Sequence, residues 1–345
     1  MTGMIRSWPL ALTAAVIAVL VILPLLLPNF WIANILGRSI AYGIIALSLT
    51  FLATYGGFVS LAQTMIAGVA GYTIAILAPT AIPAGAGWSY GLAIPFAILM
   101  ATLAGLIVGA IAVRTRGIYL LMITLALAVG FSLFVQSNVE LFNGYEGIRN
   151  VVGPDVFGMP FRTPLVFYYV SLATAVLLYL GVMYLVRTPF GLVLQALRDN
   201  SRRAAALGYN TALHRIAAFG AAGFIAGCGG VLTCFYNIGI SPGSVGMGAT
   251  VNILIMSVIG GLGHPIGAFI GALIFTLIDT FAASIYDRDR FNTLIGLLFL
   301  VIVLASPDGV LGIGKKLAGL FRRKERSAEA APVSPAQASP AQSEH

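Results

Sequence analysis

Long apolar runs, separated by short stretches rich in glycine, proline or charged residues, fill most of the chain. A helix needs about 20 apolar residues to cross a hydrocarbon layer about 30 Å thick, because each residue adds about 1.5 Å. The runs therefore predict about ten transmembrane helices. They cover residues 9–28, 33–53, 59–78, 90–113, 117–137, 164–186, 214–237, 247–262, 265–285 and 291–306.

Composition agrees with this pattern. The chain has 345 residues, of which 59% are hydrophobic and 9% are charged, whereas an average soluble domain is about 25% charged. A cytosolic enzyme, a disulfide-stapled secreted module and a nucleic-acid-binding domain are excluded, despite the net charge of +8. We expect an all-α polytopic membrane protein in contact with lipid and with no nucleic-acid partner.

The basic residues predict the orientation. With the N-terminus inside, fourteen of the 19 lysines and arginines fall in inner segments, as the positive-inside rule requires. The five external ones are Arg38, Arg149, Arg162, Arg288 and Arg290. Both termini are thus expected to be cytoplasmic.

The same pattern divides the chain into a membrane domain and a tail. Residues 1–314 form the predicted transmembrane domain, with a cytoplasmic loop at 187–214 and an external loop at 138–163. Residues 315–345 are basic and then rich in Ala, Pro, Ser and Gln. Such a composition cannot bury a core and predicts a disordered cytoplasmic tail.

Few residues are suited to catalysis. His214, His264 and His345 are the only histidines, and they fit no metal motif or triad. Residues 309–316 resemble a phosphate-binding loop, but Lys316 replaces the Ser or Thr that contacts magnesium. We expect no catalytic residue, no metal and no cofactor bound by this chain.

Polar residues inside the apolar spans are candidates for a translocation path. Ser60 and Gln63 follow a glycine pair, Tyr72 lies further along the same span, and Asp279 is the only carboxylate well inside a span. Polar groups in lipid are costly unless they face protein or water. These polar residues therefore either line a translocation path or form hydrogen bonds between helices. For Asp279 a third alternative is contact with water at the outer end of its span.

Glycines at the same interruptions predict close helix packing, because they leave room for a neighbouring backbone. The positions are Gly56, Gly57, Gly263, Gly267 and Gly271.

The cytoplasmic loop contains a predicted short helix. Asn200 or Ser201 is suited to cap its start, Ala204 to Ala206 continue it, and Gly208 is suited to end it in the left-handed conformation. Its arginines alone would serve to bind lipid phosphates, but a capped, alanine-rich helix favours docking to another protein.

Four motifs in this order resemble those of a known family. They are residues 46–49 with 55–63 (ALSL and YGGFVSLAQ), 196–210 (ALRDNSRRAAALGYN), 260–272 (GGLGHPIGAFIGA) and 307–312 (PDGVLG). Together they resemble the permease subunits of branched-chain amino acid (Liv-type) ABC importers, and among them the M-like permease. Ala62 stands where the family usually has glycine, and Asp308 where a basic residue is common.

The resemblance implies a Liv-type permease bundle in the bacterial inner membrane that forms the path for branched-chain or related amino acids. It implies four partners: a second permease, two ATP-binding subunits that hold ATP and magnesium, and a periplasmic substrate-binding protein. The ATPase-coupling residues would be Arg198, Asp199, Asn200, Arg202, Arg203, Ala204, Ala205, Leu207 and Gly208.

Other functions remain open at this stage. A related branch of the family carries urea and short amides. A stand-alone secondary transporter would need ion-coupling groups in its core, where Asp279 is the single acid. A membrane enzyme would need clustered His, Asp or Glu, and a scaffold would need no polar interruptions.

Overall fold

The computed structural model describes residues 20–25, 27–79, 85–115, 117–155 and 158–285, together with Gly296, Gly309, Val310 and Gly312. Most of the predicted spans 9–28 and 291–306 lies outside these residues, and so does the whole tail 315–345. Those predictions stay untested.

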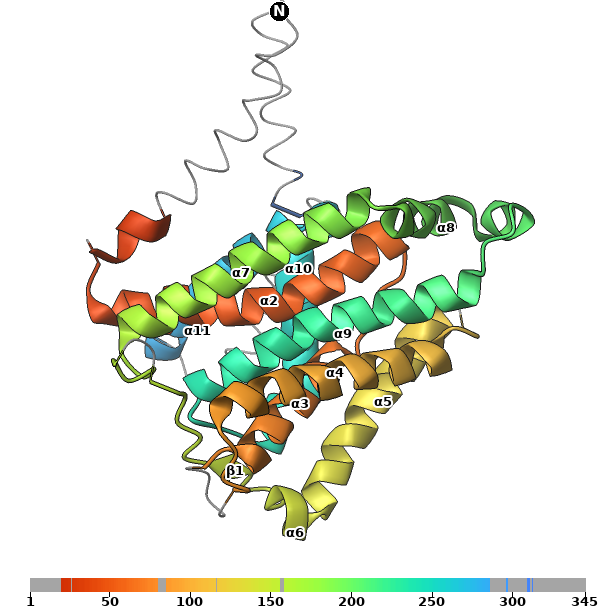
Figure 1. Cartoon of the computed structure of the whole chain (residues 1–345). Helices are drawn as coiled ribbons and strands as arrows, with labels where there is room; N and C mark the ends of the chain where they lie inside the picture. The colour runs from red at the N-terminus through yellow and green to blue at the C-terminus, as the bar shows by residue number, and fades with distance from the viewer. Residues whose placement is uncertain are drawn as a thin grey trace, which may run out of the picture.

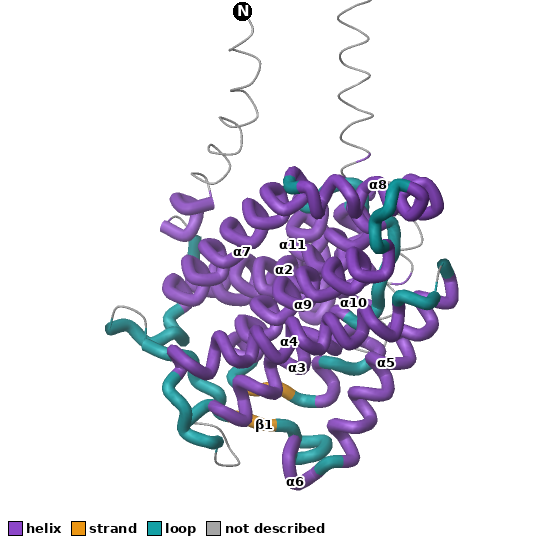
Figure 2. Tube along the Cα trace, turned by 45° about the vertical axis from the view of Figure 1, so that its right-hand side comes forward, coloured by secondary structure: helices purple, strands orange, loops and turns teal. Residues whose placement is uncertain are grey.

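The described part of the chain is a helical bundle (Figures 1 and 2). Its long helices are α2 (Arg38–Phe51), α3 (Gln63–Leu77), α4 (Tyr90–Ala112), α5 (Ile118–Ser137), α7 (Pro164–Arg187), α8 (Pro189–Ala206), α9 (Thr211–Tyr236), α10 (Met247–Gly260) and α11 (Ile266–Ile285). Short elements are η1 (Leu23–Leu25), α6 (Val139–Phe142) and η4 (Pro242–Ser244). Two π-helical segments, η2 (Trp31–Gly37) and η3 (Leu52–Gly56), extend α2 at its two ends.

Six helical stretches in the described residues are long and apolar enough to cross a membrane. They are Trp31–Gly56, Tyr90–Ala112, Ile118–Ser137, Pro164–Arg187, Thr211–Tyr236 and Pro242–Gly260. Each overlaps a predicted span, including the short eighth one. The helical membrane architecture is therefore confirmed, while the count of ten stays a prediction.

The predicted span 59–78 differs from the structure. Helix begins only at Gln63, so α3 has 15 residues and is about 22 Å long at 1.5 Å per residue. The chain between η3 and α3 is not helical, because Gly57 has φ of +71° and ends η3 in the left-handed conformation. The Ser48 hydroxyl donates to the Gln63 side-chain oxygen over 3.0 Å, which places the start of α3 inside the bundle.

Helices α2 and α9 form the centre of the bundle. Most side chains of both are buried, whereas most of those on α4, α5 and α7 are not. Exposed apolar residues such as Leu103 and Ile107 on α4 fit a lipid-facing or partner-facing surface. Helix α9 packs most extensively on α4 and α3.

The two ends of the bundle have different structures (Figure 1). At one end lies α8, drawn in green at the upper right. At the other, β1 (Ile148–Arg149) pairs antiparallel with β2 (Gly239–Ile240), so that Ile148 is opposite Ile240. This sheet connects the predicted external loop 138–163 to the segment that follows α9.

Glycines allow α10 and α11 to pack closely. A Cβ atom on Gly267 would collide with the backbone of Gly261 and Gly260, and one on Gly271 with the backbone of Met256. This close approach agrees with the packing role predicted for Gly267 and Gly271. The prediction for Gly263 is wrong: it lies in the turn between the helices and a Cβ there would meet nothing within 4 Å, while Gly260 makes the contact.

Candidate functional site

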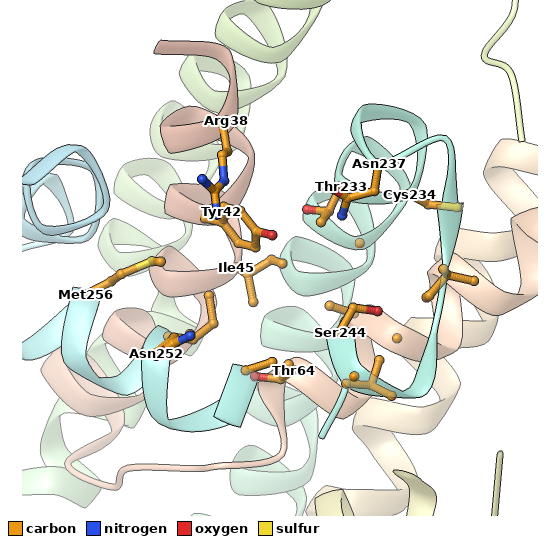
Figure 3. Close-up of a pocket in the computed structure, with 18 of the residues that line it drawn as sticks. Arg38, Tyr42, Ile45, Thr64, Thr233, Cys234, Asn237, Ser244, Asn252 and Met256 are labelled. Carbon is orange, nitrogen blue, oxygen red and sulfur yellow. The ribbon is translucent and has the colours of Figure 1, made fainter. Parts of the chain in front are cut away.

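A polar cavity of about 200 Å³ lies among α2, α3, α9, α10 and α11. Figure 3 shows side chains from α2, α9 and α10 pointing into a common space. The polar and charged residues that line it are Arg38, Tyr42, Thr64, Thr233, Asn237, Ser244, Asn252, Thr276 and Asp279. The wall therefore combines apolar helix faces with polar and charged groups that are suited to fix the orientation of a small molecule.

An ion pair forms part of this wall. Arg38 Nη1 lies 2.7 Å from Asp279 Oδ2, and the two side chains are 29% and 23% exposed. The Arg38 guanidinium also lies 5.6 Å from the centre of the Tyr42 ring, within range of a cation–π interaction. Arg38, counted above as an external loop charge, instead lies in the first turn of α2, where its charge is balanced by Asp279.

The structure separates the four predicted path residues. Asp279 lines the cavity, but Ser60, Gln63 and Tyr72 do not. All three are buried; Gln63 accepts from Ser48, and the ring of Tyr72 packs edge-on against Phe142. In the described residues Ser60 accepts only from the nearby Ala62 N–H, whereas the contacts of Gln63 and Tyr72 join separate helices. The transport role of all three stays a prediction.

Sequence reasoning missed most of the cavity wall. Arg38 is the one charged residue in the second predicted span and Asn252 the one amide in the eighth, and that signal would have marked them. Thr233 and Ser244 carry no such signal, because isolated hydroxyls are common in membrane helices and bond to their own backbone.

The predicted loop helix is present at the opposite end of the bundle, as the last part of α8. Asn200 breaks the helical geometry with φ of −158° and ψ of 98°. Its Oδ1 accepts from the N–H groups of Arg202 and Arg203, each over 3.1 Å. The structure thus identifies Asn200, of the two residues considered, as the cap of the helix at residues 201–206.

The end of this helix is also as predicted. Gly208 has φ of +89°, and its N–H donates to the Ala205 carbonyl over 3.0 Å while the Tyr209 N–H donates to Ala204. These bonds satisfy carbonyls that would otherwise lack partners at a helix end. Both boundaries are therefore defined by local hydrogen bonds.

One side of the short helix holds it to the rest of α8, and the other is exposed. Ala204 is buried with Val193 and Leu197. Ala205 is exposed, and Leu207 is 76% exposed. A rigid helix end with small and apolar residues outward is suited to fit a groove on another protein.

Arg198 ties α8 to the end of α2. Its Nη1 donates to the Thr54 carbonyl over 2.7 Å, and its stem packs against Gly57. Gly56 and Gly57 are predicted helix-packing positions, but Gly56 ends η3 and Gly57 begins the turn to α3. A Cβ on Gly56 would meet the Phe58 ring, and one on Gly57 the Arg198 side chain. The first and second motifs therefore meet in space.

Substitution of Gly57 should weaken this connection. Gly57→Ala places a side chain in the left-handed region, at a cost of about 1–2 kcal/mol, and also displaces Arg198. Gly87 has the same φ of +71°, but a methyl group added there would meet nothing within 4 Å, so Gly87→Ala is the matched control. We expect Gly57→Ala to lower the thermal stability of the purified protein more than Gly87→Ala does. Equal losses would show that Arg198 adjusts freely.

Comparison with known proteins agrees with these features. A family model described as branched-chain amino acid transport system / permease component matches residues 31–304. The chain belongs to this permease family. With its six membrane-length helical stretches in the described residues, it is thus a multi-pass membrane permease.

Individual relatives of this permease are distant. The high-affinity branched-chain amino acid transport system permease protein LivM of Escherichia coli K12 is 26% identical over 296 residues, covering 78% of this chain and 65% of the relative. A probable LivM of Methanocaldococcus jannaschii is 27% identical over 239 residues, covering 62% and 67%. The ribose import permease protein RbsC of Haemophilus influenzae is 23% identical over 312 residues, covering 87% and 93%. No solved structure matches this permease significantly.

Proposed function

We propose that this chain is the transmembrane permease subunit of an ATP-driven importer that carries branched-chain or related amino acids across the inner membrane. The family match over residues 31–304 supports the permease role. The observation that carries the choice of amino acids is the cavity lined by both Arg38 and Asp279. An amino acid bears one charge of each sign, and a sugar bears neither.

The partners follow from the same proposal. Relatives include both LivM and LivH permeases, which supports a second permease beside this one. The capped end of α8 would dock on one of two ATP-binding subunits, which would hold ATP and magnesium. That end of the bundle, and both termini, would then face the cytoplasm.

The external loop 138–163 would receive substrate from a periplasmic binding protein. Because β1 in this loop pairs with β2 beside the cavity, a partner bound to the loop would lie close to the segment that carries Asn237 and Ser244. This arrangement supports a direct route from the partner to the cavity.

The test is uptake by the purified complex. Proteoliposomes that contain the chain with its partner permease, ATP-binding subunits and binding protein should accumulate labelled leucine at least about tenfold above the level without ATP. Labelled ribose and urea serve as the comparison substrates, because a ribose permease is among the relatives.

The outcomes separate the alternatives. ATP-driven uptake of ribose or urea without leucine would overturn the substrate and leave the permease role. Uptake by the chain alone, driven by an ion gradient without ATP, would instead identify a secondary transporter and overturn the importer role.

A further inference from the structure

We propose that Arg38 and Asp279 select zwitterions: an entering amino acid separates the ion pair, its carboxylate binding Arg38 and its ammonium binding Asp279. The inference rests on the proposed function. It adds which residues recognise the substrate and which charge state the substrate must have.

The position of the pair supports a role beyond helix packing. Arg38 belongs to α2 and Asp279 to α11, so the contact joins two helices across the cavity wall. Both side chains line the cavity and are partly exposed. A charged pair within apolar spans is costly to keep unless it has a function, and this one is accessible to a molecule in the cavity.

A second, independent observation points to a ligand at the same place. Thr276 lies one helical turn before Asp279, lines the cavity and is 1% exposed. In the described residues its hydroxyl has no hydrogen-bond partner. A buried hydroxyl without a partner is destabilising, and an ammonium group held by Asp279 would supply a donor for it.

The energetics of exchange favour a zwitterion. When it enters, one ion pair is replaced by two, so neither of the two partly exposed charges is left unpaired. A sugar or an alcohol that separated Arg38 from Asp279 would leave both charges incompletely paired, which is strongly unfavourable in a poorly solvated site. A cation or an anion would satisfy one residue and leave the other. Arginine is also the side chain best suited to bind a carboxylate through two parallel hydrogen bonds.

The size of the cavity agrees with this class of substrate. At about 200 Å³ it is smaller than the roughly 300–1,000 Å³ of pockets for drug-sized ligands. Its apolar wall includes Ile45, Ile253 and Met256, which would surround an aliphatic side chain while the charged groups bind the ends of the backbone.

Neutral substitutions separate recognition from structure. Arg38→Gln or Asp279→Asn alone leaves one unpaired charge and should impair assembly as well as uptake. The double variant R38Q/D279N keeps a hydrogen bond between α2 and α11 without any charge. We expect it to assemble with its partners in normal amounts and to lose leucine uptake by about 100-fold or more. Arg114→Gln, which removes an exposed charge after α4, is the matched control and should transport normally.

A second measurement needs neither variant. Cys234 is a free cysteine that lines the same cavity, so Ser244→Cys is made together with Cys234→Ala. The new thiol on the cavity wall then reports occupancy in the purified complex through its reaction with a small thiol reagent. Leucine should slow its labelling. Leucinol, which lacks the carboxylate, and isocaproate, which lacks the ammonium group, should not do so at the same concentration.

The inference is overturned if R38Q/D279N imports leucine at the wild-type rate, or if leucinol or isocaproate protects the thiol of the Ser244→Cys variant as well as leucine does. These results differ from failure of the proposed function, in which the wild-type complex itself does not import leucine.

Discussion

Ala205→Pro is expected to abolish ATP-driven uptake while the protein still inserts into the membrane. The substitution removes an N–H inside the helix at residues 201–206 and costs about 3 kcal/mol, a change of about a hundredfold in the equilibrium of that helix. Ala205 is exposed, so no core contact is lost. The coupling proposal requires a rigid helix here, because ATP-driven closure of the partner subunits would otherwise not reach α7 and α9.

The control uses the same substitution four residues earlier. Ser201 is the first residue after the Asn200 cap, a position where proline is well tolerated, and the extended conformation of Asn200 is compatible with a following proline. Co-purification with the ATP-binding subunits and substrate-stimulated hydrolysis should remain near normal for Ser201→Pro and fall sharply for Ala205→Pro. Normal values for Ala205→Pro in a correctly inserted protein would show that this helix does not couple the subunits.

Gly271→Ala is expected to disrupt the pairing of α10 with α11. The added methyl group would meet the backbone of Met256 and Gly260, and backbone atoms cannot move aside as a flexible side chain can. Overpacking of this kind typically costs about 1–3 kcal/mol or more. Because Asp279 and Thr276 lie on α11, the displaced helix should also lower leucine uptake. Thermal unfolding in detergent and uptake in proteoliposomes measure the two effects.

Gly248→Ala is the matched control on the partner helix. Gly248 lies in the first turn of α10, and an added methyl group there would meet nothing within 4 Å. The same change should be neutral or slightly stabilising, since alanine is favoured over glycine in a helix by about 1 kcal/mol. If both variants unfold at the wild-type temperature, the close approach at Gly271 is not needed for stability.

The membrane helices could be predicted from the sequence because the signal is local and repeated. An apolar run of sufficient length has few alternatives to a buried or lipid-facing helix. The limits of this reasoning appear at residues 57–62, where the composition is apolar but Gly57 directs the chain out of the helix.

The loop helix was also predictable, for a related reason. Its cap joins Asn200 to residues two and three positions later, and its end depends on Gly208 and carbonyls a few residues earlier. Interactions over such short separations follow directly from the order of residues. What the sequence left open was which of Asn200 and Ser201 caps the helix, and geometry alone selects between them.

The cavity depends on contacts that no sequence spacing contains. Arg38 and Asp279 are at opposite ends of the described chain and meet only because α11 packs on α2. Likewise Gly309 of the last motif lies against Gly261 of the third, and Gly57 of the first lies against Arg198 of the second. The sequence by itself therefore determined the class of protein, its helices and the capped end of α8, all of which follow from hydropathy and short-range hydrogen bonds. Only the tertiary structure decided which polar residues face a common cavity, because that depends on how each helix is rotated and which neighbour it packs against.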